Sequence, residues 1–169
     1  MIISGGFNYV INGAQYDGLA RMNSNGTVDG NFSPPTFVRG SPNIVTLQPD
    51  GKILVAGRFR MFGGQVRDGF ARLNSNGTLD AAFVSPITAP AGNSNNIASI
   101  SLQPDGKILV GGNFAINWAP STTSTHLIRL NTNGALDTTF NPNINNFSNT
   151  PVDAIAVQSN GKILIGGSF

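Results

Sequence analysis

Short runs in which apolar and polar residues alternate extend along the whole chain, and Gly-containing turns separate them. One pair of runs flanks the Pro-Asp-Gly turn at 49–51, and another flanks the Ser-Asn-Gly turn at 75–77. A two-residue period over four to eight residues is typical of β-strands, and a turn with Gly where a positive φ is required joins two strands into a hairpin. The pattern therefore predicts an all-β chain built from hairpins.

The two hairpins recur along the chain, which is typical of repeat architectures. We call them the first hairpin and the second hairpin of the repeat. Copies of the first-hairpin segment are residues 47–59, 102–114 and 157–169, and copies of the second-hairpin segment are residues 20–32, 71–83 and 128–140. The turn glycines Gly51, Gly106 and Gly161 are 55 residues apart each time. The chain therefore holds three copies of a unit of about 55 residues.

The hairpin turns also predict the strand register. A three-residue turn with its Gly in the left-handed region places Leu47 opposite Ile53 and Val45 opposite Val55, so that apolar residues meet on one face. The equivalent pairs are Leu102 with Ile108, Val157 with Ile163, Leu73 with Leu79 and Arg72 with Asp80. Apolar and charged residues are thus both matched across the hairpins, which supports this register.

Two hairpins per repeat predict a four-stranded antiparallel blade, and the chain is expected to be a β-propeller-like array of such blades. A β-solenoid would need shorter rungs, and a β-sandwich would not require near-identical hairpins at fixed spacing. We expect a single repeat domain over 1–169, with repeat segments 1–42, 43–95 and 96–151, and with 152–169 opening a further blade. Three blades are too few for a typical closed propeller, so we expect self-association or neighbouring repeats of a longer chain.

Composition excludes several classes of partner. Only 11% of residues are charged, the net charge is +2, and no run of Lys or Arg occurs, which argues against nucleic acid. No stretch approaches the ~20 apolar residues of a membrane span, so we expect no membrane insertion. The residues 1–7 lack the charged and apolar regions of a signal peptide. If the protein is exported, we expect its signal to lie outside this chain or the export to follow another route.

Candidate catalytic and metal-binding residues are few. The chain has no Cys and no Glu, and its lone histidine, His126, has no second His at a catalytic or metal-binding spacing. The sequence Asn-Ser-Asn-Gly at 74–77 lacks the length and the final Glu of a calcium loop. The recurring acids Asp29, Asp80 and Asp137 are expected to face Arg21, Arg72 and Arg129 within their own hairpins, as framework pairs. We therefore expect no enzyme activity, no metal and no cofactor.

The paired signature resembles a known family. The block Gln-Pro-Asp-Gly-Lys-Ile-Leu-Val-Gly-Gly-x-Phe, followed by Ala-Arg-Leu-Asn-x-x-Gly-x-Leu-Asp-x-x-Phe, is similar to the delta-60 repeat, a β-propeller domain of unknown function found in tandem in large bacterial proteins. The resemblance implies a propeller fold, an association with exported or surface-located bacterial proteins, and no established activity. The chain departs from the pattern at 159–161, where Ser-Asn-Gly replaces Pro-Asp-Gly, and in its first copy, which lacks the opening strand.

The up-and-down order of the strands in a blade predicts a binding face. The tight turns of the first and second hairpins both lie at one end of the blade, and they vary little among the copies. The links at 8–17, 60–68 and 115–126, and those between blades at 33–42, 84–95 and 141–150, emerge at the other end and differ between copies. Non-recurring aromatic and cationic residues on these links are the candidate binding residues, with Trp118 as the best anchor: Trp118, Phe62, Tyr16, Tyr9, Phe147, Arg60 and Arg67.

Two further functions are weighed against a non-enzymatic structural or interaction module of a bacterial surface, extracellular filament or phage-tail assembly. A lectin-like glycan binder would place the same polar and aromatic groups in every repeat, whereas these links differ. A propeller hydrolase or lyase would bring carboxylates or histidines together at one point, which this sequence does not offer. The interaction module is therefore the preferred hypothesis, with a protein or glycan as the partner.

Overall fold

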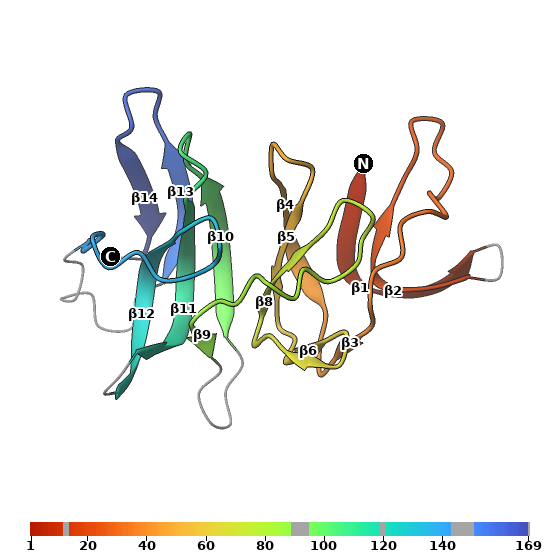
Figure 1. The fold of residues 1–169 in the computed structure, drawn as a ribbon, viewed down its shortest axis with the longest axis horizontal. Helices are drawn as coiled ribbons and strands as arrows, with labels where there is room; N and C mark the ends of the chain where they lie inside the picture. The colour runs from red at the N-terminus through yellow and green to blue at the C-terminus, as the bar shows by residue number, and fades with distance from the viewer. Residues whose placement is uncertain (12–13, 89–94, 119–120, 143–150, 169) are drawn as a thin grey trace. The chain divides into compact units, whose positions relative to one another are not determined.

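The computed structural model describes residues 1–11, 14–88, 95–118, 121–142 and 151–168, and every regular element within these ranges is a β-strand (Figure 1). No helix in the described part is long and apolar enough to cross a membrane. The chain divides into two compact units, residues 1–81 (unit 1) and residues 82–169 (unit 2). The predicted all-β fold class is confirmed, and each unit is described by itself below.

The strands form small antiparallel sheets. Unit 1 holds three sheets with the orders β1-β2, β4-β5-β8 and β3-β6-β7. Its strands are β1 (Ile2–Ile11), β2 (Ala14–Arg21), β3 (Phe37–Val38), β4 (Pro42–Leu47), β5 (Ile53–Gly57), β6 (Met61–Phe62), β7 (Gln65–Val66) and β8 (Phe70–Leu73). Unit 2 holds the sheet β10-β11-β12, to which β9 is added on β11, and the pair β13-β14. Its strands are β9 (Ile87–Thr88), β10 (Asn96–Leu102), β11 (Ile108–Trp118), β12 (Ser121–Leu130), β13 (Val152–Val157) and β14 (Ile163–Gly167).

The first hairpins have the predicted register. Val45 lies opposite Val55 and Leu47 opposite Ile53 between β4 and β5, and the equivalent pairs form in the other two copies. The amide of Gly51 donates to the carbonyl of Gln48 over 2.9 Å, and Gly51 has a φ of 82°, where a side chain would be strained. The Pro-Asp-Gly sequence thus sets the turn, and the turn sets the register of both strands.

The second hairpins keep the predicted pairing but not a full fourth strand. Leu73 bridges Leu79, and the amide of Asp80 donates to the carbonyl of Arg72 over 2.9 Å. Beyond this bridge the chain turns, and Phe83 enters the interior. The blade therefore has three strands and a single bridge pair in place of the fourth strand.

The core of unit 1 lies around β5, which is buried at every position and is the central strand between β4 and β8. Leu47 pairs with buried Ile53, as the predicted register requires, yet its side chain is 62% exposed. Leu47 is the last residue of β4, next to the turn. The recurring aromatics Phe32, Phe59, Phe83 and Phe114 are buried, whereas Phe7 and Phe140 are half-buried.

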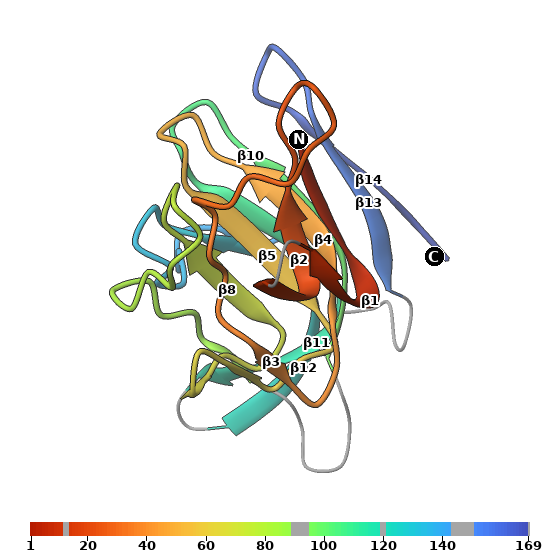
Figure 2. The same cartoon turned by 90° about the vertical axis from the view of Figure 1, so that its right-hand side faces the viewer.

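The link regions are more regular than predicted. In unit 1 the turn between β4 and β5 lies at one end, and β3 and β6 lie at the other, as strand parity requires (Figure 1). At that end the link between blades pairs with the link that joins the first and second hairpins of a blade. The pairs are β3 with β6 in unit 1 and β9 with β11 in unit 2. The views in Figures 1 and 2 both place β3 beyond the end of β4 and β5. The described parts of both kinds of link therefore include β-strands, which are short in the links between blades.

Candidate interaction face

Each second hairpin holds an Arg–Asp pair, as predicted from the sequence. Arg21 Nε lies 2.7 Å from Asp29 Oδ2, Arg72 Nε lies 2.9 Å from Asp80 Oδ2, and Arg129 Nε lies 2.8 Å from Asp137 Oδ2. Sequence reasoning missed a third member, the lysine of the first hairpin. Lys52 Nζ lies 2.9 Å from Asp80 Oδ2 and Lys107 Nζ lies 2.8 Å from Asp137 Oδ2. The Lys–Asp contacts thus tie the two hairpins of a repeat together, and the recurrence of Lys at one repeat position was the available signal.

These contacts keep the carboxylates ionised. Burial raises the pKa of the Asp80 carboxyl, but hydrogen bonds from Lys52 and Arg72 outweigh burial and hold the pKa below its ordinary value. The hydrogen bond from Lys107 holds the pKa of Asp137 far below its ordinary value. A general acid at neutral pH needs a raised pKa, so the lowered pKa values of these carboxyls do not suit that role. The described residues contain no group of three His, Cys, Asp or Glu side chains placed to hold a metal ion.

The three-stranded sheet β3-β6-β7 brings together residues from both links of unit 1, and we call it the link sheet. Phe37 lies opposite Phe62, and their rings stack with centroids 4.2 Å apart and planes at 6°. Phe59 packs on both rings, with centroids 5.1 Å from Phe37 and 5.8 Å from Phe62. All three side chains are buried in the core. One row of the link sheet is thus anchored by an aromatic cluster.

The neighbouring row of the link sheet points outward. Val38 pairs with Met61, and Met61 pairs with Val66, so the three side chains line up across the sheet. Val38 is 45% exposed, Val66 is 54% exposed, and Met61 is half-buried. We call these three residues the apolar row. Its members come from segments more than twenty residues apart, and only the sheet pairing brings them together.

An arginine adjoins each residue of the apolar row. Arg39 follows Val38, Arg60 precedes Met61, and Arg67 follows Val66. The amide of Arg60 donates to the carbonyl of Val38 over 3.1 Å, and the amide of Arg67 donates to the carbonyl of Arg60 over 2.9 Å. Backbone hydrogen bonds between the three segments thus continue for one residue beyond the apolar row. One carboxylate, that of Asp68, lies 4.0 Å from Arg60 Nε. In an extended strand neighbouring side chains point to opposite faces, and the Arg67 side chain donates to Gln65 Oε1, so the arginines border the apolar row without lying in it. The surroundings of the apolar row therefore carry a local excess of positive charge.

Arg39 has an unusual backbone conformation, with a φ of 62°. A non-Gly residue in the left-handed region carries a conformational cost, and such residues are enriched at functional sites. Arg39 is exposed, so no packing requirement accounts for an arginine at this position. Arg39 is therefore a candidate functional residue.

Two of the candidate aromatics predicted from the sequence, Phe62 and Tyr16, are not exposed. Phe62 is 0% exposed and Tyr16 is buried, so their placement on an exposed face is wrong. Trp118 is the last residue of β11, opposite Ser121, and Tyr9 lies on β1 opposite Tyr16; neither is on a loop, and both side chains lie outside the described residues. Phe147 also lies outside them. Arg60 and Arg67 do border the apolar row.

The fold and the paired signature agree with the comparison with known proteins. A family model described as a domain of unknown function (DUF5122) beta-propeller matches residues 1–32, 48–83 and 103–140, which together make up more than half of the chain. The chain belongs to the DUF5122 β-propeller family. No curated protein and no solved structure matches the chain. The three matched DUF5122 segments confirm the three repeats predicted from the sequence.

The matched DUF5122 segments cover only part of the link sheet. Residues 48–83 include β6 and β7, whereas β3, with Val38, lies between two matched segments. The apolar row therefore joins residues of the DUF5122 signature with residues outside it. A surface assembled in this way can differ among members that share the same framework.

Proposed function

We propose that this DUF5122 chain is a non-enzymatic propeller module that binds a protein partner through the apolar row and its arginines. The observation that carries the proposal is the row of Val38, Met61 and Val66. It lies on a sheet whose phenylalanines, Phe37 and Phe62, are buried in the core. Rigid presentation of exposed apolar side chains lowers the entropy cost of binding. The resemblance to the delta-60 repeat supports a setting at a bacterial surface, in an extracellular filament or in a phage-tail assembly.

The chemistry of the face favours an acidic partner. Arg is enriched at binding hot spots because its planar group pairs with carboxylates while its stem covers apolar surface. Three arginines beside three apolar residues therefore suit a segment that alternates apolar and acidic side chains. Strand β7 lies at the edge of the link sheet, where an extended segment can add as a further strand.

A peptide array tests this proposal against the glycan alternative. The probes are eight-residue peptides of alternating Asp and Val, matched peptides of alternating Asn and Val, and a panel of neutral and anionic glycans. We expect the Asp-Val peptides to be retained, and we expect added salt to weaken the binding because exposed charges are screened. Retention of neutral glycans with no retention of Asp-Val peptides would favour the lectin-like function instead.

A paired set of variants identifies the face. Arg60→Ala and Val66→Ser are each expected to weaken binding of the Asp-Val peptide by about fivefold or more, a typical effect of removing one contact residue. The matched control is Asp105→Ala, which removes an exposed charge from a tight turn of unit 2. If Asp105→Ala weakens binding as much as Arg60→Ala does, the link sheet is not the binding face.

Arg39→Gly separates binding from stability. Gly adopts a φ of 62° without strain, so we expect the free energy of unfolding to stay unchanged or to rise by up to about 1 kcal/mol. Binding of the Asp-Val peptide is expected to weaken because one cation is lost. Urea denaturation and peptide titration on the same preparation measure both effects. A variant that unfolds more easily would show that the Arg39 side chain has a structural role.

A further inference from the structure

Asn–Gly sequences occur five times in the chain, and four of them form tight turns in the described residues. These four are at 25–26, 76–77, 133–134 and 160–161, whereas the fifth, at 12–13, lies outside the described residues. The turn glycines have φ values between 80° and 94°, and all four asparagine side chains are exposed. Asparagine before glycine is prone to deamidation, because glycine has no side chain to shield its backbone nitrogen.

Deamidation is an intramolecular reaction of the Asn–Gly backbone. The glycine nitrogen loses its proton to hydroxide and bonds to Cγ of the asparagine, and the side-chain nitrogen leaves as ammonia. Water then opens the succinimide ring that results. Attack of water at Cγ gives aspartate, whereas attack at the main-chain carbonyl carbon gives isoaspartate, whose backbone runs through Cγ. The net reaction consumes one water, releases one ammonia and adds one negative charge at neutral pH.

Hydrogen bonds within each turn oppose this reaction. The amide of each turn glycine donates to the carbonyl three residues earlier over 2.9–3.1 Å. Each asparagine Oδ1 accepts a bond from the amide two residues later over 3.0–3.1 Å. Cγ bonds to the glycine nitrogen only after the turn opens locally and the carboxamide leaves these partners. Every additional bond to the carboxamide therefore slows the reaction.

In the two Asn–Gly turns of unit 1 a threonine adds a second bond to the carboxamide. Thr27 Oγ1 donates to Asn25 Oδ1 over 2.7 Å, and Thr78 Oγ1 donates to Asn76 Oδ1 over 2.7 Å. Each hydroxyl also accepts a bond from Nδ2 of the first asparagine of its turn over 3.0 Å. Since an amide NH2 group only donates, the hydroxyl proton is directed at Oδ1. Two bonds thus hold each carboxamide of unit 1.

The two Asn–Gly turns of unit 2 lack this hydroxyl. Ala135 and Lys162 stand where the turns of unit 1 have threonine. Within the described part of the chain, Oδ1 of Asn133 accepts only the amide of Ala135, and Oδ1 of Asn160 accepts only the amide of Lys162. One bond thus holds each carboxamide of unit 2.

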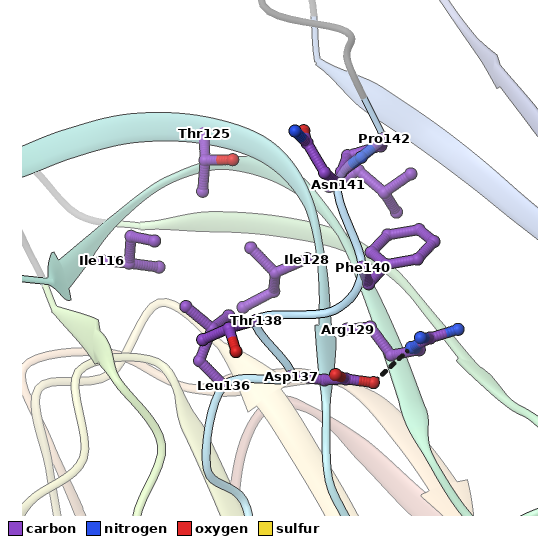
Figure 3. Close-up of a pocket in the computed structure, with 11 residues that line it drawn as sticks. Ile116, Thr125, Ile128, Arg129, Leu136, Asp137, Thr138, Phe140, Asn141 and Pro142 are labelled. Atoms are coloured by element: carbon purple, nitrogen blue, oxygen red, sulfur yellow. Dashed lines mark hydrogen bonds and ion pairs between the residues drawn. The ribbon is translucent and has the colours of Figure 1, made fainter.

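Asn76 and Asn133 form a matched pair for comparison. Both stand in second hairpins, both are followed by a buried glycine, and both glycine amides bond over 2.9 Å. An Arg–Asp pair closes both hairpins beside the turn. Figure 3 shows the pair of Arg129 and Asp137, 2.8 Å apart, at a pocket of about 290 Å³. The two turns therefore differ chiefly in the hydroxyl of Thr78.

We propose that Asn133 and Asn160 are sites of spontaneous deamidation in the folded chain, and that the threonine hydroxyls protect Asn25 and Asn76. Each conversion removes one unit of positive net charge, so the two together lower the net charge of the chain from +2 to 0. The added charges lie on the tight turns of unit 2. This modification is independent of the link sheet, so its test and that of the proposed function do not affect each other.

The aspartate product fits these turns. Asp50 and Asp105 occupy the position of Asn160 in the other first hairpins. Their Oδ1 atoms accept the amides of Lys52 and Lys107 over 3.0 and 3.1 Å, as Asn160 Oδ1 accepts its own partner. Isoaspartate instead lengthens the backbone of the turn by one carbon. The turn therefore retains its hydrogen bonds with aspartate and loses them with isoaspartate.

Mass spectrometry of the full chain tests the proposal. The protein is held in mildly alkaline buffer, where hydroxide removes the glycine proton faster, and samples are digested at intervals to locate each converted asparagine. We expect Asn133 and Asn160 to convert at least about threefold faster than Asn25 and Asn76, a factor within the effect of one hydrogen bond. In urea, where no turn is formed, the four rates are expected to be similar. If Asn76 converts as fast as Asn133 in the folded chain, the proposal is wrong.

Reciprocal variants isolate the hydroxyl. Ala135→Thr is expected to slow the conversion of Asn133 by about threefold, and Thr78→Val is expected to speed that of Asn76 by a similar factor. Ala135→Val is the matched control, because valine has the branched shape of threonine without its hydroxyl. It is expected to leave the conversion of Asn133 unchanged. If Ala135→Val slows the conversion as much as Ala135→Thr does, the hydroxyl is not the protecting group.

Discussion

Phe62→Ala is expected to lower the free energy of unfolding by about 3–4 kcal/mol, the largest effect of any substitution proposed for this chain. The ring is fully buried, stacks on Phe37 and packs on Phe59, so truncation leaves a cavity and breaks two aromatic contacts. The link sheet would lose the anchor of its inner row. Urea denaturation followed by far-UV circular dichroism measures the change in the free energy of unfolding.

Val66→Ala is the matched control because Val66 lies on the adjacent strand with its side chain 54% exposed. It is expected to change the free energy of unfolding by no more than about 0.5 kcal/mol. A Phe62→Ala protein that keeps its stability would mean that the aromatic cluster is not formed. Any loss of peptide binding by Phe62→Ala is expected to follow unfolding of the link sheet, and it would not identify Phe62 as a contact residue.

Asp80→Ala is expected to cost about 2–3 kcal/mol of the free energy of unfolding, because removal of one partner leaves a buried charge uncompensated. The Arg72 side chain is 10% exposed and the Asp80 side chain 9%, whereas Lys52, at 34%, remains open to water and limits the loss. Asp50→Ala is the matched control, since Asp50 is exposed in a tight turn and accepts a bond from the Lys52 amide. If Asp50→Ala lowers the free energy of unfolding as much as Asp80→Ala does, the role of Asp80 as the partner of the buried Arg72 is contradicted.

The same carboxylate predicts an acid-sensitive contribution to stability. The pKa of Asp80 is below its ordinary value of 3.8 in the folded chain, so the folded state binds this proton less readily than the unfolded state does. Its contribution is therefore complete above pH ~5 and declines as the pH falls through 3.8 toward the folded pKa. Urea midpoints of the original chain and Asp80→Asn are expected to converge as the pH falls below 3.8. A constant difference between them at low pH would contradict this role.

Burial raises the contribution that the Arg72–Asp80 pair is expected to make to stability. An exposed Arg–Asp pair contributes only about 0–1 kcal/mol, so an exposed pair would predict only a modest loss from Arg72→Ala. Arg72 and Asp80 are buried, however, so the loss is expected to approach that of Asp80→Ala. Each triad also joins the two hairpins of its repeat, because the lysine comes from the first hairpin and the aspartate from the second. Thus the triads serve as cross-links within a repeat.

The sequence alone determined what depends on local contacts. The Pro-Asp-Gly, Ser-Asn-Gly and Thr-Asn-Gly turns set the register of the first and second hairpins, because the turn conformation and the two-residue strand period leave one alignment of apolar residues. The repeat spacing showed the propeller blades, and the recurring Arg and Asp positions showed the framework pairs. Lys52 and Lys107 recur in the same way, but their partners lie 28 and 30 residues away, beyond what hairpin register predicts.

Only the tertiary structure decided which non-recurring residues are exposed. Phe62 and Val66 stand on one short link, yet the first is buried and the second is open, because the pairing of β6 with β3 turns one row of the link sheet inward. That pairing joins segments with no repeat signal between them, so no local rule selects its register. A link that is variable in sequence therefore holds both core residues and candidate binding residues. Only the folded structure distinguishes the two kinds.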